Sequence, residues 1–495
     1  MAFSDLLHTV GEAGRFQVIH VLLLSLTMFL FPFHNLVQNF TAATPPHHCS
    51  IPSLQNYSLV APRDSVRNIT KEVVQVFIPQ ERGIPASCSR YVQAQWQLML
   101  NDSATVGDDM NIQGCVDGWE FDTSQFSSTI VTEWDLVCEK RVLKQMAQSI
   151  YMGGVLVGAL VLGALSDRYG RRSVMMISHL GIVASGIWVF FTQTLVVYML
   201  ARFTDGVFVS GSLLNIHSLG NVVFVSGRIL DTYTVKLTLF VRVFRFHPES
   251  ARWLIIKGRL DDALKSLKYV ARVNGKRVVL NIDVMSKNTY TFLDLVRTAA
   301  IRKTTCAILF VWFTTSFAYY GLSLDLQGFK VDMYVLMVMF GLADLPMKLI
   351  SAVVIGFVGR RAAQAGALLL TGVMSFALIF ISKDKQMLRA SFAVAGKGCI
   401  GASFLVVFLY TGELYPTVMR QNGFGAGSMM ARVGAILAPL VIHSGEFYPL
   451  LPQIIYSSVC FVGGMAALTL PETRNRTLPD TIEDLQQKYN NRFVF

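Results

Sequence analysis

Long apolar stretches separated by short polar ones recur along most of this chain. A helix needs about 20 mostly apolar residues to cross roughly 30 Å of hydrocarbon. Ten stretches meet that requirement, at residues 16–37, 143–166, 173–193, 195–215, 304–324, 332–357, 363–382, 390–411, 422–443 and 450–470. The first lacks a small-residue cleavage site before Asn35, so it is not a cleaved signal peptide. The pattern predicts an all-α integral membrane protein with ten spans.

The segments between these stretches differ in charge. Residues 249–303 hold twelve Lys and Arg against five acidic residues, whereas residues 40–142 hold seven against twelve. Lys and Arg of short loops stay on the cytoplasmic side of a membrane. We therefore expect an N-terminal transmembrane half at 16–248 and a C-terminal half at 304–470, with loop 40–142 extracellular and segments 1–15, 249–303 and 471–495 cytoplasmic.

Composition supports this reading. The 495 residues are 53% apolar and only 15% charged, whereas soluble domains average about 25% charged residues. The formal net charge of +11 lies mainly in the predicted cytoplasmic segments. Positive charge placed in this way marks orientation in the membrane, so we expect contact with lipid and no nucleic-acid partner.

The predicted extracellular loop has the chemistry of an oxidising compartment. It holds an even number of cysteines, which predicts disulfides whose pairing the sequence leaves open: Cys49, Cys88, Cys115 and Cys138. Four glycosylation sequons lie in it or at its membrane edge, at Asn39, Asn56, Asn68 and Asn101. The run His47-His48-Cys49 has no second ligand pair at zinc spacing, so we expect no metal site.

A charged turn repeats between the two halves. The run Gly163-Ala-Leu-Ser-Asp-Arg-Tyr-Gly-Arg-Arg172 has a shorter counterpart in Gly356-Phe-Val-Gly-Arg-Arg361. Each half then ends on a Pro-Glu element, at Pro248-Glu249 and Pro471-Glu472. Such clusters can hold two helix bundles together and release them, although ordinary positive loops are the alternative. We predict a gating cluster of Asp167, Arg168, Arg171, Arg172, Glu249, Arg252, Arg360, Arg361, Glu413, Arg420, Glu472 and Arg474.

Further strings carry a family resemblance across nearly the whole chain. They include Ser128-Thr-Ile-Val-Thr-Glu-Trp-Asp-Leu-Val-Cys138, Ser166-Asp-Arg-Tyr-Gly-Arg-Arg172 and Tyr410-Thr-Gly-Glu-Leu-Tyr-Pro-Thr417. The chain resembles the organic anion transporter branch of the major facilitator solute carriers. That resemblance implies a major facilitator fold with two inverted-repeat halves and a central site that faces each side of the membrane in turn. It also implies a multi-pass plasma-membrane glycoprotein that takes up organic anions in exchange for intracellular dicarboxylates, with no cofactor.

The first half departs from this pattern. Arg361 and Glu472 are 111 positions apart, whereas the equivalent Arg172 and Glu249 are only 77 apart, so the first half is 34 residues short. The shortfall falls after residue 215, and 33 residues do not hold two spans of about 20 residues each. We predict loss of family helices five and six. A splice form, a faulty gene model or a decayed paralogue would each produce this, and a transport-inactive form is the alternative function.

Ionisable residues inside spans are costly, so each is a site candidate. Arg432 lies mid-span with no acid within a helical turn, which leaves a buried pair across helices as the alternative. Lys348 follows Asp344 by four positions, so a pair within one helix is its alternative. The resemblance places Arg432 and Lys348 in a positively charged centre for anions. In the related cation-carrying branch, an acid stands at the position of Arg432.

An anchored organic anion also needs apolar walls. Aromatic residues at helical spacing supply candidates, although packing is the commoner role of such stripes. We predict substrate contacts from Trp312, Phe317, Tyr320, Phe404 and Phe408, and an outer vestibule residue in Asn35.

No motif predicts catalysis. The run Gly423-Phe-Gly-Ala-Gly427 lies on an apolar stretch without a preceding strand, so it is not a dinucleotide-binding loop. No nucleotide-binding Gly-Lys-Ser/Thr loop is present, so transport would be secondary and not ATP-driven. An ion channel or receptor remains a further alternative, which the repeated charged turns disfavour.

Overall fold

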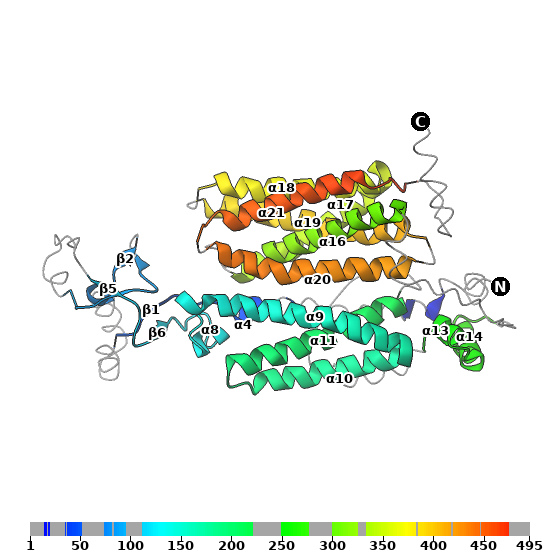
Figure 1. Cartoon of the computed structure of the whole chain (residues 1–495), viewed down its shortest axis with the longest axis horizontal. Coiled ribbons are helices and arrows are strands. Elements are labelled where there is room, and N and C mark those ends of the chain that lie inside the picture. Colours follow the sequence, from blue (N-terminus) through cyan, green and yellow to red (C-terminus); the bar gives the residue numbers. More distant parts are fainter. Residues whose placement is uncertain are drawn as a thin grey trace. The chain divides into compact units, whose positions relative to one another are not determined.

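The chain divides into two units (Figure 1). We call residues 37–146 the loop unit, and residues 1–36 with 147–495 the helical unit. The computed structural model describes residues 14–16, 18–19, 35, 37–51, 74–81, 84–95, 111–220, 249–276, 299–324, 333–382, 385–416, 419–445 and 447–474. Much of the predicted span 16–37, the segment from 221 to 248 in which the sequence predicts a shortfall, and the tail from 475 onward therefore lie outside the described residues.

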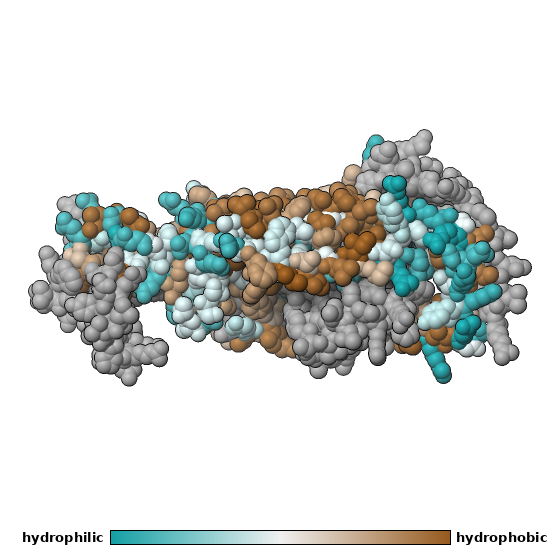
Figure 2. All heavy atoms as spheres, turned by 90° about the horizontal axis from the view of Figure 1, so that it is seen from below, coloured by the Kyte–Doolittle hydropathy of each residue, from teal (hydrophilic) through white to brown (hydrophobic). Residues whose placement is uncertain are grey.

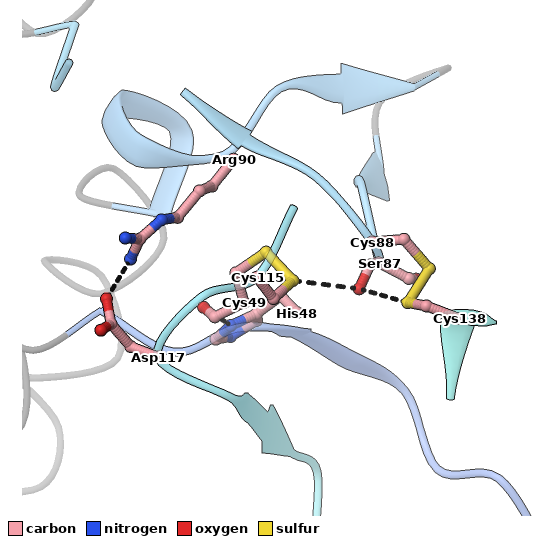
Figure 3. Close-up of a disulfide and its surroundings, with 8 residues drawn as sticks. All are labelled: His48, Cys49, Ser87, Cys88, Arg90, Cys115, Asp117 and Cys138. Atoms are coloured by element: carbon pink, nitrogen blue, oxygen red, sulfur yellow. Dashed lines mark hydrogen bonds and ion pairs between the residues drawn. A yellow bond between two sulfur atoms is a disulfide. The ribbon is translucent and has the colours of Figure 1, made fainter. Parts of the chain in front are cut away.

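Short strands and two disulfides order the loop unit. The strands pair antiparallel as β1 with β6, β2 with β3 and β4 with β5. Their bounds are His47–Cys49 (β1), Gln80–Glu81 (β2), Ile84–Pro85 (β3), Arg90–Tyr91 (β4), Ile112–Gln113 (β5) and Trp119–Phe121 (β6). Cys49 bridges Cys115, and Cys88 bridges Cys138 (Figure 3). Because strands of two or three residues enclose little apolar core, these covalent ties are the main constraint on the described part of the loop.

Long helices make up the helical unit. Their bounds are Arg141–Tyr169 (α9, which begins in the loop unit), Arg171–Phe190 (α10), Leu195–Gly220 (α11), Ala299–Leu324 (α16), Met333–Val358 (α17), Arg360–Phe380 (α18), Gln386–Leu414 (α19), Arg420–Ser444 (α20) and Leu451–Thr469 (α21). Among the described residues, eight helices are long and apolar enough to cross a membrane. The prediction of an all-α membrane fold is confirmed.

Four shorter helices and one 3-10 turn lie outside these long helices. In the loop unit these are Gln38–Thr41 (α4), Ile130–Glu133 (α8) and a single 3-10 turn at Cys138–Lys140. The central loop predicted at 249–303 contains Ala251–Ile256 (α13) and Leu260–Val273 (α14). Ala263, Leu267 and Ala271 form the buried face of α14, which packs on α13.

Glycines let α9 and α11 approach each other closely. A Cβ at Gly154 would lie 2.1 Å from the carbonyl oxygen of Phe203, and one at Gly158 would lie 2.3 Å from that of Val207. Real Cβ atoms do not approach within 3.0 Å of another atom in this way. In lipid, where apolar side chains gain little by leaving the solvent, such backbone contacts supply much of the packing energy between helices.

The surface of the helical unit is largely apolar. On α17 the exposed side chains Leu342, Leu345, Leu349 and Val353 recur every three or four residues and form one stripe. Figure 2 shows hydrophobic surface over the long helices, with hydrophilic residues gathered toward the end at which α13 and α14 lie. A stripe of this kind suits contact with lipid chains rather than water.

Candidate functional site

Arg432 is buried in the middle of α20, with 8% of its surface exposed. Its Nη1 donates to the carbonyl oxygen of Ser428 at 2.7 Å and also to the Ser428 hydroxyl. Its Nε is buried and has no hydrogen-bond partner among the described residues. No acidic side chain of the described residues pairs with it. The pair across helices considered from the sequence is therefore absent from that part of the chain, and Arg432 keeps a net positive charge.

Two tyrosines lie within electrostatic reach of Arg432, Tyr151 on α9 and Tyr320 on α16. The Tyr151 hydroxyl donates to Oδ1 of Asn35 at 3.0 Å. On the same helix the Ser149 hydroxyl donates to the carbonyl oxygen of Ile436 at 2.9 Å. Helices from both halves of the chain therefore meet around Arg432 (Figure 1). Asn35, which the sequence predicts in the vestibule, is placed here by its bond to Tyr151.

A buried ion pair lies beside Tyr151, and the prediction from the sequence missed it. Nη1 of Arg202 lies 3.1 Å from Oδ2 of Asp205 on α11, and both side chains are buried. The Ser185 hydroxyl donates to Oδ1 of the same carboxylate at 3.1 Å. The Arg202 guanidinium lies 4.2 Å from the centroid of the Tyr151 ring, within cation–π range. The signal was present, since two ionisable residues stand three apart inside the predicted span 195–215.

Lys348 has a partner on its own helix. Its Nζ lies 2.5 Å from Oδ2 of Asp344, four residues earlier on α17, and 42% of its side chain is exposed. This is the helix-local pair considered from the sequence. The pair neutralises much of the positive charge that Lys348 would otherwise offer to an anion.

Lys397 on α19 is more deeply buried than Lys348 and is not among the residues predicted from the sequence. Its surface is 4% exposed, and its Nζ lies 2.8 Å from the centroid of the Tyr319 ring. Nζ also donates to the Ser323 hydroxyl and, at 3.4 Å, to the carbonyl oxygen of Tyr319. The Tyr319 and Tyr320 rings are 5.5 Å apart and perpendicular. Adjacent tyrosines of α16 therefore connect a buried lysine with Arg432.

The predicted aromatic residues fall into packed groups. Trp312 is buried, donates through Nε1 to the Thr411 hydroxyl at 2.9 Å and meets the Phe408 ring at 4.5 Å. Phe317 is buried beside the Tyr456 ring at 5.0 Å. These contacts correspond to the packing role considered from the sequence. Phe404 differs, since its ring meets the edge of Tyr319 at 5.1 Å, next to Lys397.

The two Pro-Glu elements cap helices in the same way. Glu249 accepts the backbone N–H groups of Arg171 at 3.0 Å and Arg172 at 3.2 Å, at the start of α10. Glu472 accepts those of Arg360 at 2.9 Å and Arg361 at 3.1 Å, at the start of α18. The sequence suggested guanidinium groups near these acids. The carboxylates instead contact backbone N–H groups, where a helix N-terminus favours negative charge.

The environment of Glu472 changes its acidity. Burial acts to raise the pKa of its carboxyl, but backbone hydrogen bonds from Arg474, Arg360, Arg361 and Thr473 outweigh it. The pKa of Glu472 is therefore lowered from its ordinary value. Each bond favours the charged form, which holds the carboxylate ionised against the helix end.

Guanidinium contacts in the predicted gating cluster occur elsewhere. Arg360 Nε lies 2.9 Å from Oε2 of Glu413, and the Thr473 hydroxyl donates to the same oxygen at 2.6 Å. Arg474 donates to the carbonyl oxygen of Phe357. The remaining members are Arg168, whose guanidinium lies over the Tyr169 ring, and Arg420 at the first position of α20. The side chains of Asp167 and Arg252 lie outside the described structure.

One predicted glycosylation site needs correction. Asn39 is buried in α4 with 8% of its surface exposed, whereas a glycan is bulky and needs an exposed asparagine. This removes Asn39 from the proposed sites. The sequons at Asn56, Asn68 and Asn101 lie outside the described residues.

Comparison with known proteins decides the family. Residues 102–215 and 231–485 match the family model described as sugar (and other) transporter. Solute carrier family 22 member 6-B of Xenopus laevis is 42% identical, with 98% of this chain and 95% of that protein covered. The chain belongs to solute carrier family 22. This confirms the resemblance drawn from the sequence, and it makes the chain a multi-pass membrane transporter of the major facilitator type and not an enzyme.

Two further relatives agree on the family of this solute carrier. Member 6 of Danio rerio is 42% identical over 99% of this chain and 95% of that protein, and member 20 of Mus musculus is 39% identical over 99% and 94%. Among solved structures, the proton:xylose symporter XylE bound to 6-bromo-6-deoxy-D-glucose has a TM-score of 0.47 at 14% identity, covering 71% of this chain and 91% of that one.

The alignment lengths bear on the prediction that the first half of this solute carrier is short. The alignment with the Xenopus relative spans 532 positions, which exceeds the 495 residues of this chain by 37. At least that many positions of the relative therefore have no counterpart here. The family model also passes over residues 216–230, inside the segment where the sequence places the shortfall.

Proposed function

We propose that this protein is a secondary active transporter of organic anions, which it takes up in exchange for intracellular dicarboxylates. The observation that carries the proposal is Arg432, a buried cation with no acidic partner among the described residues. The effective cost of burying an unpaired ion is several kcal/mol. A bound carboxylate or sulfate would remove that cost and would accept two parallel N–H bonds from the guanidinium.

Tyr151 and Tyr320 supply the walls of the proposed site. Both lie within electrostatic reach of Arg432, and they come from helices in different halves of the chain. An aromatic organic anion would place its charged group on Arg432 and its ring between these side chains. Because the walls belong to both halves, rocking of one half against the other would open the site to each side of the membrane in turn.

The uncompensated charge of Arg432 also favours exchange of one anion for another. After an anion leaves, Arg432 is again uncompensated, so return of the empty carrier is unfavourable. A second anion restores compensation and allows the return step. A dicarboxylate suits this role because one of its carboxylates would compensate Arg432 on the return step.

The charged turns hold the cytoplasmic end of each half of the proposed carrier. Glu249 and Glu472 hold the starts of α10 and α18, and each belongs to the segment that ends its half of the chain. Each contact joins residues that belong to the same half, so these carboxylates would keep the cytoplasmic end of each half rigid while the halves rock. The Lys and Arg bias of residues 249–303 supports a cytoplasmic location for this end and for both termini, and the proposed uptake function calls for the plasma membrane.

A second candidate function is a transport-inactive form that stays in the membrane system or assembles with an intact relative. Its support is the excess of 37 alignment positions over the chain length, together with the break in the family match after residue 215. A first half without two of its helices would lack one wall of the central cavity.

Uptake measurements distinguish the two functions. Cells expressing this chain are given a labelled aromatic carboxylate, with and without preloading of a dicarboxylate, and surface protein is quantified by biotinylation. We expect uptake that preloading stimulates and that Arg432→Ala abolishes, while the exposed control Arg302→Ala leaves it unchanged. Surface protein with no uptake, restored by grafting the absent segment from a relative after residue 215, would establish the inactive form instead.

A further inference from the structure

His47 in the loop unit has one ring nitrogen engaged and one not. Its Nδ1 lies 2.9 Å from the carbonyl oxygen of Pro45. A carbonyl only accepts hydrogen bonds, so Nδ1 carries the proton and the neutral ring has its lone pair on Nε2. Nε2 is buried and has no hydrogen-bond partner within the described parts of the chain. A buried lone pair without a partner is costly, and such a group calls for an explanation.

The ring of His47 lies beside the bridge between Cys88 and Cys138. The Nε2 or Nδ1 atom of His47 and the two Sγ atoms all lie within 4.8 Å of one another. Because Nδ1 is committed to Pro45, Nε2 is the available ligand atom. Figure 3 shows the bridge next to Ser87, whose carbonyl oxygen lies 3.7 Å from Cys138 Sγ and 3.9 Å from Cys115 Sγ. Residues from three distant parts of the loop thus place one imidazole and two sulfurs together.

We propose that His47, Cys88 and Cys138 form a latent site for a divalent cation of the zinc type, which the disulfide keeps closed and reduction opens. Thiolate and imidazole are the ligands that zinc prefers, at bonds of about 2.3 and 2.0 Å, and two cysteines with one histidine leave a fourth position for water. This proposal departs from the expectation, drawn from the sequence, that the loop has no metal site. The sequence missed it because the three ligands are spread over 91 positions, without the spacing of a known motif.

The ring of His47 is already held as a ligand would be. Metal-binding histidines almost always donate their second ring N–H to a carbonyl or carboxylate, which fixes the tautomer, and Pro45 supplies that acceptor. The backbone of His47 pairs with Phe121 across β1 and β6, and the two rings pack at 5.6 Å. The imidazole therefore needs little reordering to bind.

Opening the site consumes two molecules of a small thiol. Their sulfurs become joined in a new disulfide as the Cys88–Cys138 bond breaks, and their two protons end on the cysteine sulfurs. Binding of M²⁺ then displaces both protons, so two thiolates and a neutral imidazole compensate the charge of the ion. Cys138 begins the 3-10 turn that leads into α9. Both the bridge and the bound metal would therefore tie the start of that helix to the loop.

Cobalt binding to the purified full-length protein in detergent tests the proposal, with Co²⁺ as a spectroscopic stand-in for Zn²⁺. The protein is reduced with a phosphine, the reductant is removed, and thiolate-to-cobalt absorption is followed during titration. We expect one equivalent of Co²⁺ on the reduced protein, displaced by Zn²⁺, and none on the oxidised protein. His47→Ala should weaken binding by more than the roughly tenfold that loss of a supporting residue costs.

Two controls separate this site from other thiols and from misfolding. His48→Ala changes the neighbouring histidine, whose Nδ1 contacts the Cys49 carbonyl instead, and should bind Co²⁺ like the wild type. Cys49→Ser with Cys115→Ser removes the other bridge and should retain the absorption, whereas Cys88→Ser with Cys138→Ser should lose it. Equal Co²⁺ affinity in His47→Ala and His48→Ala, or absorption that survives loss of Cys88 and Cys138, would overturn the proposal.

Discussion

The guanidinium of Arg202 lies over the ring of Tyr151, 4.2 Å from its centroid. Arg202 also pairs with Asp205, so this buried cation is already compensated by its own helix. Arg432 is the contrasting case on α20, because no acid of the described residues pairs with it. Tyr151 therefore interacts with a neutralised arginine and with an uncompensated one, and only the second is left to attract an anion.

Removal of the acid that pairs with Arg202 should destabilise the helical unit. Asp205→Asn leaves a buried guanidinium without its counter-charge, which costs about 3–5 kcal/mol. We expect a clear fall in the thermal midpoint of the detergent-purified protein. The double variant Arg202→Met with Asp205→Leu removes both charges and should melt above the single variant. A single variant that melts with the wild type would show that the pair contributes nothing.

Close packing of α9 on α11 predicts different outcomes at adjacent glycines. Gly154→Ala places a methyl group 2.1 Å from the Phe203 carbonyl oxygen, so the helices must separate. Gly153→Ala meets nothing within 4 Å. We expect Gly154→Ala to destabilise by about 1–3 kcal/mol, as overpacking does, and Gly153→Ala to be neutral. The comparison is made by thermal melting of both variants, and equal midpoints would contradict it.

The turn before α18 requires a glycine. Gly359 has φ +96° and ψ 167°, a region open essentially to glycine alone, and a Cβ there would lie 2.6 Å from Oε2 of Glu472. Gly359→Ala should therefore cost about 1–3 kcal/mol and disturb the cap. Gly356→Ala, three residues earlier on α17, meets nothing within 4 Å and serves as the matched control. Melting midpoints measure both effects.

The cap of α18 predicts a dependence of stability on pH. Because the pKa of Glu472 is lowered in the folded chain, its stabilising contribution is present above the unfolded pKa of about 4.3. That contribution is lost as the pH falls through the lowered value. Glu472→Gln should be less stable at neutral pH by about 0.3–1 kcal/mol, the usual size of such a helix-end charge.

Melting curves recorded from neutral pH down to acid measure this difference. The gap between wild type and Glu472→Gln should narrow as the pH falls. Asp262→Asn changes an exposed carboxylate that pairs with Arg259 and should have a smaller effect at neutral pH. A gap that stays constant with pH would contradict a role for the ionised carboxylate.

Long apolar runs predicted the helices, because each segment must be long and apolar enough by itself to cross the hydrocarbon. Their ends were less well placed. The sequence predicts a span from 363, yet α18 begins at Arg360, since Glu472 accepts the first backbone N–H groups. Likewise the described part of α16 begins at Ala299, ahead of the predicted start at 304, as a helix can continue past the hydrocarbon. A contact between residues more than 100 positions apart leaves no mark in a local pattern.

In the candidate site, too, some features could be predicted from the sequence and others depend on helix packing. Arg432 could be predicted because an arginine inside an apolar run is rare and costly. Arg202 and Asp205 carry the same signal, but their mutual compensation and their place beside Tyr151 depend on how α9 packs on α11. The burial of Lys397 is set by neighbouring helices that the run around it does not reveal.

The sequence alone determined that this protein spans a membrane, which orientation its charges favour, and which residues are costly enough to be site candidates. Each of these follows from hydropathy and charge counted along one segment. The tertiary structure decided which charges remain uncompensated, since compensation depends on groups brought by other helices. It also brought His47 to the bridge of Cys88 and Cys138, because strand pairing and disulfides, unlike lipid, act between distant residues.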